Sequence, residues 1–195
     1  MSDTTLTALH RAARVAMVSG SVAALGIAGQ WAKAAPAAGE LPQGERITAG
    51  DATIGRDGRV MTITQRSDRL ITEWQGFSIG REAHVEFIQP GRESAALNRV
   101  TGGRPSEIFG SLSANGQVVL VNQAGIHFAS GSRVDAGSLV ASTLAIADED
   151  FLADRLRFAG GSQAGIVAEG EINIAEGGRL ALVAPTIEQR GRIEA

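Results

Sequence analysis

IVAEGEI at residues 166–172 matches IEQRGRI at residues 187–193 as I-x-x-x-G-x-I, displaced by 21 positions. One period holds three short apolar runs with glycines between them. They are residues 166–168, 172–174 and 180–183. Such a unit cannot bury its apolar side chains alone, whereas stacked copies place isoleucine over isoleucine in a continuous core. The repeat therefore predicts a parallel β-helix. The alternative, an antiparallel β-sandwich, does not predict a 21-residue register.

The region upstream of the repeat alternates apolar and polar residues in short pieces from Ile47 onward. This pattern, punctuated by glycine, is typical of strands, and the five prolines all lie outside the apolar runs. The single Asn-Gly doublet, Asn115-Gly116, predicts a local hairpin, and the apolar spacing of residues 148–158 predicts at least one helical turn. The expected strands include residues 60–63, 70–74, 85–88 and 118–121.

The composition excludes several classes of protein. The 195 residues include 25 glycines and no cysteine, so there is no disulfide framework, thiolate zinc site or cysteine nucleophile. The formal net charge of −3 gives no reason to expect nucleic-acid binding. Hydrophobic residues make up 44% of the chain, which is enough for a buried core.

The first 34 residues have the organisation of a secretory signal peptide. Basic residues end at Arg14, an uncharged apolar run follows over residues 15–29, and Ala32-Lys33-Ala34 forms an A-x-A cleavage site before Ala35. The apolar run is shorter than the ~20 residues of a membrane-spanning helix. An uncleaved anchor and an ordinary amphipathic helix are the alternatives. Cleavage after Ala34 would leave a mature chain without lysine.

An ordered series of motifs follows the leader. It consists of WQGFSIG (74–80), LNRVTGG (97–103), SANGQV (113–118), LVN (120–122) and LVASTL (139–144). In this order and spacing the series resembles the N-terminal secretion domain of filamentous-haemagglutinin-type exoproteins, the cargo of two-partner secretion (TPS). The likeness covers about residues 41–158.

The resemblance implies an all-β fold: a right-handed parallel β-helix with an N-terminal β cap and an extra-helical hairpin. It implies a targeting function without catalysis. The domain would cross the periplasm of a Gram-negative bacterium, be recognised by the POTRA domains of a TpsB-type outer-membrane transporter, and nucleate β-helix folding as the chain reaches the cell surface or the medium. Adhesin-like activity, and any host-cell or glycan receptor, would belong to downstream regions.

The residues expected to shape turns and contact the transporter, in part by presenting an edge for β-augmentation, are Asn98, Arg99, Asn115, Gly116, Asn122 and Gly125. The family usually carries an N-P-N-G turn where this chain has Asn122-Gln123-Ala124-Gly125. Asn122 can still cap the turn and Gly125 can still supply a positive φ. Without the proline the unfolded chain keeps more conformational freedom, which lowers the stability of the turn by about 0.4–1 kcal/mol.

No catalytic, metal or cofactor site is predicted. His84 and His127 lack zinc-motif spacing, and the acidic residues 148–150 lack the pattern of a calcium loop. A polysaccharide-cleaving β-helix would align carboxylates on adjacent coils. The nearest candidates are Asp135, Glu169, Glu171 and Glu188, but Glu169 and Glu188 are displaced by 19 positions instead of 21. A stand-alone secreted β-helical carbohydrate-binding adhesin is the alternative function.

The expected organisation is a signal peptide at 1–34, a linker at 35–46, the secretion domain at 47–158 and further coils at 159–195. The sequence ends directly after a coil element without a polar cap. Because solenoids need terminal caps, we expect a fragment or truncated product of a longer exoprotein.

Overall fold

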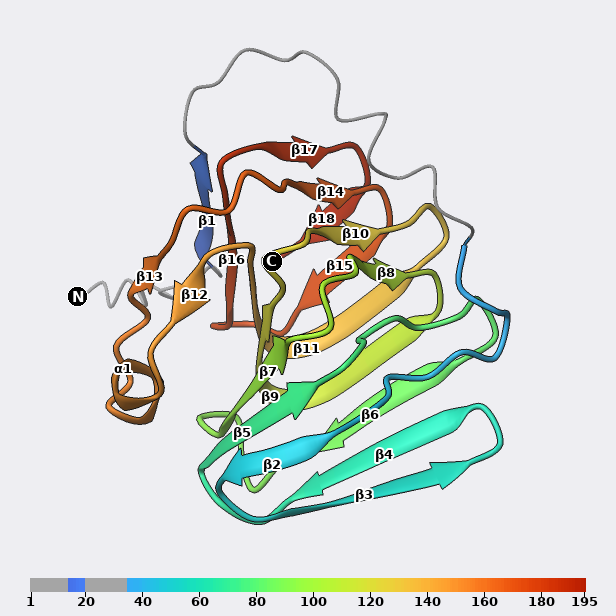
Figure 1. Cartoon of the computed structure of the whole chain (residues 1–195), viewed down its shortest axis with the longest axis vertical. Coiled ribbons are helices and arrows are strands. Elements are labelled where there is room, and N and C mark those ends of the chain that lie inside the picture. The colour runs from blue at the N-terminus through green and yellow to red at the C-terminus, as the bar shows by residue number, and fades with distance from the viewer. Residues whose placement is uncertain (1–13, 20–34) are drawn as a thin grey trace, which may run out of the picture.

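The computed structural model describes residues 14–19 and 35–195, which form strands stacked in coils (Figure 1). Within this part of the chain the one helix is α1 (Asp148–Leu152), so no described helix reaches membrane-spanning length. The strands are β1 (Arg14–Ser19), β2 (Arg46–Ala49), β3 (Ala52–Asp57), β4 (Val60–Gln65), β5 (Arg69–Trp74), β6 (His84–Ile88), β7 (Ala95–Val100), β8 (Ser106–Ile108), β9 (Ser111–Val121), β10 (Ile126–Phe128), β11 (Arg133–Ser142), β12 (Ala145–Ile146), β13 (Phe158–Ala159), β14 (Ile166–Ala168), β15 (Glu171–Ile174), β16 (Arg179–Ala184), β17 (Ile187–Gln189) and β18 (Arg192–Glu194).

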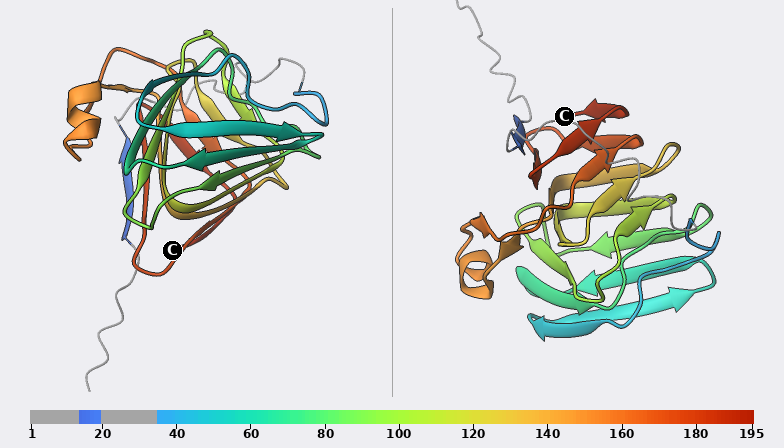
Figure 2. Two further views of the ribbon diagram at one scale, coloured as in Figure 1. Left: turned by 90° about the horizontal axis from the view of Figure 1, so that it is seen from below. Right: turned by 45° about the horizontal axis from the view of Figure 1, so that its top comes forward.

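The strands form three parallel faces around one core, and the right-hand view of Figure 2 shows the coils stacked along the axis. One face contains β4, β6, the first halves of β9 and β11, β15 and β18. A second contains β5, β7, the second halves of β9 and β11, and β16 with β1. The third contains β8, β10, β14 and β17. This arrangement confirms the predicted parallel β-helix and excludes the β-sandwich.

The 21-residue register is confirmed at the C-terminal end of the molecule. Ile166 pairs with Ile187 between β14 and β17, and Ile172 pairs with Ile193 between β15 and β18. Apolar side chains stack inside the coils in the same way further upstream, and the predicted strand segments lie in β4, β5, β6 and β9. Trp74 and Phe77 are buried core residues. Their rings meet edge to face, with the ring centroids 5.4 Å apart.

The hairpin predicted at Asn115-Gly116 is wrong. Both residues lie inside β9, which bends at this point and passes from the first face to the second. A Cβ at Gly116 would lie 2.6 Å from the carbonyl oxygen of Ser94, and a Cβ at Gly137 would lie 2.7 Å from that of Gly116. Glycine is therefore required here by the close approach of neighbouring coils at a corner, and not by a two-residue turn.

The N-terminal β cap and the extra-helical hairpin are both present. β2 and β3 pair antiparallel with β5 and β4 and cover the first coil. β12 and β13 pair antiparallel outside the coils and, with α1 between them, form a protrusion over residues 145–159 (Figure 1). The helix is shorter than the predicted segment, because it ends at Leu152 and Asp154 adopts a positive φ of 57°. Phe151 is buried in a second apolar cluster that attaches the protrusion.

The segment that follows the predicted leader lies along one side of the coils. The N–H groups of Gly80 and Glu82 donate to the carbonyl oxygens of Glu40 and Ala38, both at 2.8 Å. The predicted leader, with cleavage residues Ala32 and Ala34, lies outside the described residues except for β1, which pairs in parallel with β16.

Candidate functional site

Asn98 lies in the interior of the second face. Its Oδ1 accepts a hydrogen bond from Trp74 Nε1 at 3.0 Å, and its Nδ2 donates to the carbonyl oxygen of Ala96 at 3.2 Å. The side chain is 1% exposed. In the folded domain Asn98 therefore orients the core tryptophan and has no surface to offer a partner.

Arg99, the next residue, points outward and holds the protrusion. Its guanidinium donates to the carbonyl oxygen of Ile146 at 2.9 Å and to Asp148 Oδ1 at 2.6 Å, and Glu73 lies 3.9 Å away. Hydrogen bonds to charged groups are among the stronger side-chain contacts. Arg99 thus fixes β12 and the start of α1 against β7.

The exposed Asn115 and the buried Gly116 bind a network of buried glutamine side chains at the corner of β9. Asn115 Oδ1 accepts from the N–H of Gln89 at 2.7 Å, and its Nδ2 donates to the carbonyl oxygen of Gln89 at 2.8 Å. The Gln89 side chain in turn accepts from the N–H of Gly116 and donates to Gln65. Sequence reasoning missed Gln89 and Gln65; the available signal was a polar residue at a strand end, next to the Pro90-Gly91 turn.

Asn122 and Gly125 form the turn expected for them. Asn122 Nδ2 donates to the carbonyl oxygen of Arg104 and to Ser106 Oγ, both at 2.9 Å, while its Oδ1 accepts from the N–H of Ala124 at 2.9 Å. The N–H of Gly125 donates to the carbonyl oxygen of Asn122 at 3.1 Å, with a φ of +117° at the glycine. The turn closes without the family's proline, because the buried amide of Asn122 supplies the fixed point.

The structure brings part of the predicted set together. Arg99 and Asn122 line one concave surface of about 310 Å³, here called the turn pocket, while Asn115 and Gly116 lie at a different corner. The exposed Gln123 and the half-buried Ala124 form its rim. The complete lining is Arg99, Val100, Thr101, Gly103, Val121, Asn122, Gln123, Ala124 and Ala145.

The carboxylates considered for catalysis lie in ion pairs on the outside of the coils. Arg190 bridges Glu169, at 3.0 Å, and Glu188, and Arg133 bridges Asp135 and Glu171. A hydrogen bond from His127, reinforced by Arg190, holds the pKa of Glu169 below its usual value. Within residues 14–19 and 35–195 no three His, Asp or Glu side chains are grouped so that they could hold a metal ion.

Comparison with known proteins identifies the family. The TPS secretion domain family matches residues 38–195. The chain belongs to this family. The secretion domain of HMW1 from Haemophilus influenzae, known from a crystal structure, superposes with a TM-score of 0.75 and 32% identity, covering 78% of this chain and 41% of that one. Its likeness agrees with the β-helix described above.

Two curated relatives of this TPS secretion domain are heme/hemopexin-binding proteins of Haemophilus influenzae. One is 41% identical over 104 residues and the other 38% identical over 105 residues. The matches cover 53% of this chain but only 12% and 11% of the relatives, so the chain spans a small fraction of their length. What the comparisons show for this chain is a secretion domain that targets an exoprotein to two-partner secretion.

Proposed function

We propose that this TPS secretion domain reaches the periplasm through a cleaved leader and is recognised there by the POTRA domains of a TpsB-type outer-membrane transporter. The turn pocket is the contact surface in this proposal. The observation that carries it is the preformed turn from Asn122 to Gly125, which closes one side of a concave surface at a family motif.

The turn is held from both sides, which favours recognition. Asn122 binds the backbone of Arg104 beneath it, and Ser162 Oγ donates to the carbonyl oxygen of Gln123 at 2.7 Å from the other side. A surface ordered before contact loses little conformational entropy on binding. The exposed side chain of Gln123 is then presented to a partner in a fixed direction.

The protrusion supplies the opposite wall of the turn pocket. Ala145, the first residue of β12, lines the pocket, and Arg99 fixes this strand through Ile146 and Asp148. Arg99 is therefore a positioning residue in this proposal. Its ion pair sets the width of the surface that the transporter meets.

Regions outside this domain carry the activity of the whole exoprotein in this proposal. The names of the curated relatives refer to heme and hemopexin binding, and the matched segment is about one-eighth of their length. A host-cell or glycan receptor would likewise contact downstream regions. The secretion domain supplies the address and the first coils on which further β-helix is built.

The test is secretion of the full chain, co-expressed with its cognate transporter, measured as protein in the medium. We expect secretion to require the transporter and to fall at least tenfold in Gln123→Arg and Ala124→Glu, which change the rim without removing a hydrogen bond of the turn. Gln189→Arg, an exposed substitution on β17, is the matched control and should be secreted like the wild type. Unchanged secretion of both rim variants, with urea midpoints equal to that of the wild type, would contradict the proposed surface.

A further inference from the structure

The corner of β9 places an asparagine directly before a glycine, and this pair has a chemistry of its own. In an unfolded chain the backbone nitrogen of the next residue can attack an asparagine side chain. A glycine at that position hinders the attack least, because it has no Cβ and turns freely. Of the four asparagines, Asn115 alone precedes glycine, whereas the others precede residues with large side chains; they are Asn98, Asn122 and Asn173.

The fold requires the glycine of this pair. A Cβ at Gly116 would lie 2.6 Å from the carbonyl oxygen of Ser94 and 2.8 Å from that of Gly91. Both oxygens belong to the backbone of the preceding coil, which cannot give way without disturbing the close packing of the coils. A residue with a side chain, which would slow the attack, therefore does not fit at this position.

The fold also uses the uncharged amide of the asparagine. Asn115 Oδ1 accepts from the N–H of Gln89 at 2.7 Å, and Asn115 Nδ2 donates to the carbonyl oxygen of Gln89 at 2.8 Å. The side chain thus binds the backbone of one residue as acceptor and as donor. An ionised carboxylate only accepts hydrogen bonds, so in its place a second oxygen would face the carbonyl oxygen of Gln89.

The same corner holds the reacting atoms in place. The N–H of Gly116 donates to Oε1 of the buried Gln89 at 3.0 Å. The Gln89 side chain is itself fixed, because its Nε2 donates to the carbonyl oxygens of Ser94 and Gln117 at 3.1 and 3.2 Å. Attack requires the nitrogen of Gly116 to lose its proton and the Asn115 side chain to turn towards it. Local opening of the corner must therefore precede the reaction.

We propose that Asn115 is a deamidation site of the unfolded secretion domain, and that the folded corner suppresses the reaction and rejects its products. The nitrogen of Gly116 attacks Cγ of Asn115, the bond from Cγ to Nδ2 breaks, and ammonia leaves with the proton of the attacking nitrogen. The product is a succinimide ring, which water then opens. Opening at Cγ gives aspartate, whereas opening at the backbone carbonyl carbon gives isoaspartate, with one additional carbon in the main chain.

Neither product fits the corner. Aspartate lacks the donor that the carbonyl oxygen of Gln89 binds. Isoaspartate lengthens the main chain of β9, so Gly116 and the residues after it shift relative to the neighbouring coils. A chain that stays unfolded before secretion thus loses, with time, the ability to close this corner. The inference concerns the folding of the domain and does not depend on the turn pocket.

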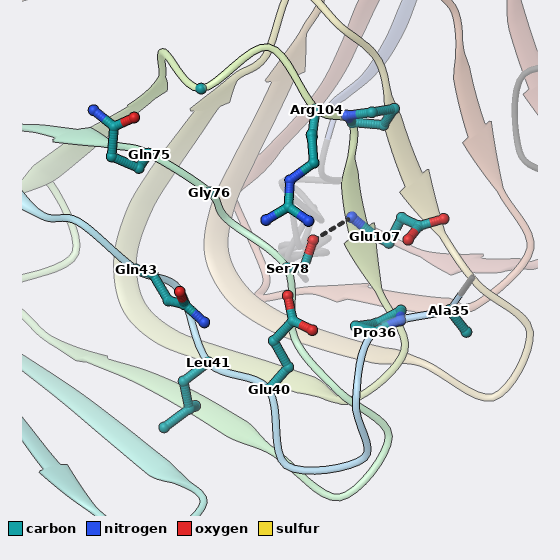
Figure 3. A pocket seen from close by; sticks show the side chains of 12 residues that line it. Ala35, Pro36, Glu40, Leu41, Gln43, Gln75, Gly76, Ser78, Arg104 and Glu107 are labelled. Atoms are coloured by element: carbon teal, nitrogen blue, oxygen red, sulfur yellow. Dashed lines mark hydrogen bonds between the residues drawn. The ribbon is translucent and has the colours of Figure 1, made fainter. Parts of the chain in front are cut away.

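The first test compares rates of deamidation in the full chain, held at pH 8 either folded or unfolded in guanidinium chloride. Peptide mass spectrometry measures the conversion of amide to acid at each residue. We expect Asn115 to react at least about tenfold more slowly in the folded protein, because the corner must open first. The pairs Gln43-Gly44 and Gln75-Gly76 are internal controls, since the longer glutamine side chain closes its ring less readily. Figure 3 shows both glutamines, one before β2 and one directly after β5.

The second test asks whether deamidated chains refold. The sample aged in guanidinium chloride is diluted, treated briefly with protease, and separated into resistant and degraded chains. We expect the deamidated form of residue 115 to be at least about fivefold rarer among the resistant chains. A sample kept unfolded for the same time at pH 5, where the backbone nitrogen reacts slowly, should refold fully.

A directly made variant checks the same point without ageing. Asn115→Asp should lower the urea midpoint by about 0.5–1 M. Gln163→Glu is the matched control, because this exposed amide also donates to a carbonyl oxygen, that of Gly161 at 3.2 Å, where water can replace it. Equal deamidation rates in folded and unfolded protein would overturn the suppression. An equal share of deamidated chains among resistant and degraded protein, or an unchanged midpoint for Asn115→Asp, would overturn the rejection of the products. Either result leaves the proposed transporter contact standing.

Discussion

Replacing Asn122 by alanine tests whether one buried amide holds the turn that defines the turn pocket. The substitution removes three hydrogen bonds, each of 2.9 Å, to the carbonyl oxygen of Arg104, to Ser106 Oγ and from the N–H of Ala124. The side chain is 1% exposed, so water cannot easily replace these bonds.

The expected destabilisation follows from these contacts. A typical hydrogen bond contributes about 0.5–1.5 kcal/mol net, and each buried group left without a partner costs about 1–3 kcal/mol. Partial relaxation of the exposed side of the turn reduces the sum, and we expect a loss of about 2–4 kcal/mol. With an m-value of about 2 kcal/mol/M, the urea midpoint falls by about 1–2 M.

The assay is urea unfolding of the full chain, followed by circular dichroism and tryptophan fluorescence. Gln123→Ala is the matched control, because this neighbour is exposed and its change should stay within about 0.5 kcal/mol. A midpoint shift for Asn122→Ala as small as that of the control would refute the argument that this amide closes the turn.

Three further predictions concern the protrusion, the ion pairs and the corners. Arg99→Ala removes the bonds to Ile146 and Asp148, so proteolysis within residues 148–158 should become faster, and a wild-type cleavage rate would argue against anchoring by Arg99. The folded-state pKa of Glu169 is depressed, so its stabilisation exists above the unfolded pKa near 4.5 and is lost as pH falls through the folded value. The stability difference between wild type and Glu169→Gln in urea should therefore be larger at pH 6 than at pH 3, and a constant difference would contradict this reading. Gly137→Ala places a Cβ 2.7 Å from the carbonyl oxygen of Gly116 and should lower the free energy of unfolding by about 1–3 kcal/mol. Gly161→Ala is the control, because a Cβ there meets open space and should leave the stability unchanged. Equal effects of the two substitutions in urea or thermal unfolding would show that corner packing does not select glycine.

The β-helix could be predicted because its signal is periodic along the chain. Isoleucines 21 positions apart stack in the predicted register, and the predicted part of the turn, the bond from the N–H of Ala124 to Asn122 Oδ1 and the positive φ of Gly125, lies within four residues. The corner at Asn115-Gly116 could not be predicted, since the carbonyl groups that exclude a Cβ there belong to residues 91 and 94 on the preceding coil. A local rule for Asn-Gly therefore gave the wrong structure.

Long-range partners were the second limit on what the sequence could predict for the candidate site. The motif predicts Arg99 as a contact residue, yet its partner Asp148 lies 49 positions away and makes it an anchor of the protrusion. The motif predicts the same role for Asn98, but this side chain is buried and bonds to Trp74, 24 positions away, inside the core. Burial and partner identity at these positions depend on which coils become neighbours.

The protrusion has a practical consequence for following export. Val134 stacks on Ile172, 38 positions later, whereas Ile172 stacks on Ile193, 21 positions later. The additional residues leave the stack at β12 and return after β13, so their number does not affect the pairing of the coils. A Cβ at Gly161 would meet no atom within 4 Å. An epitope tag inserted between Gly160 and Gly161 would therefore mark the chain on its route while every coil keeps its neighbours.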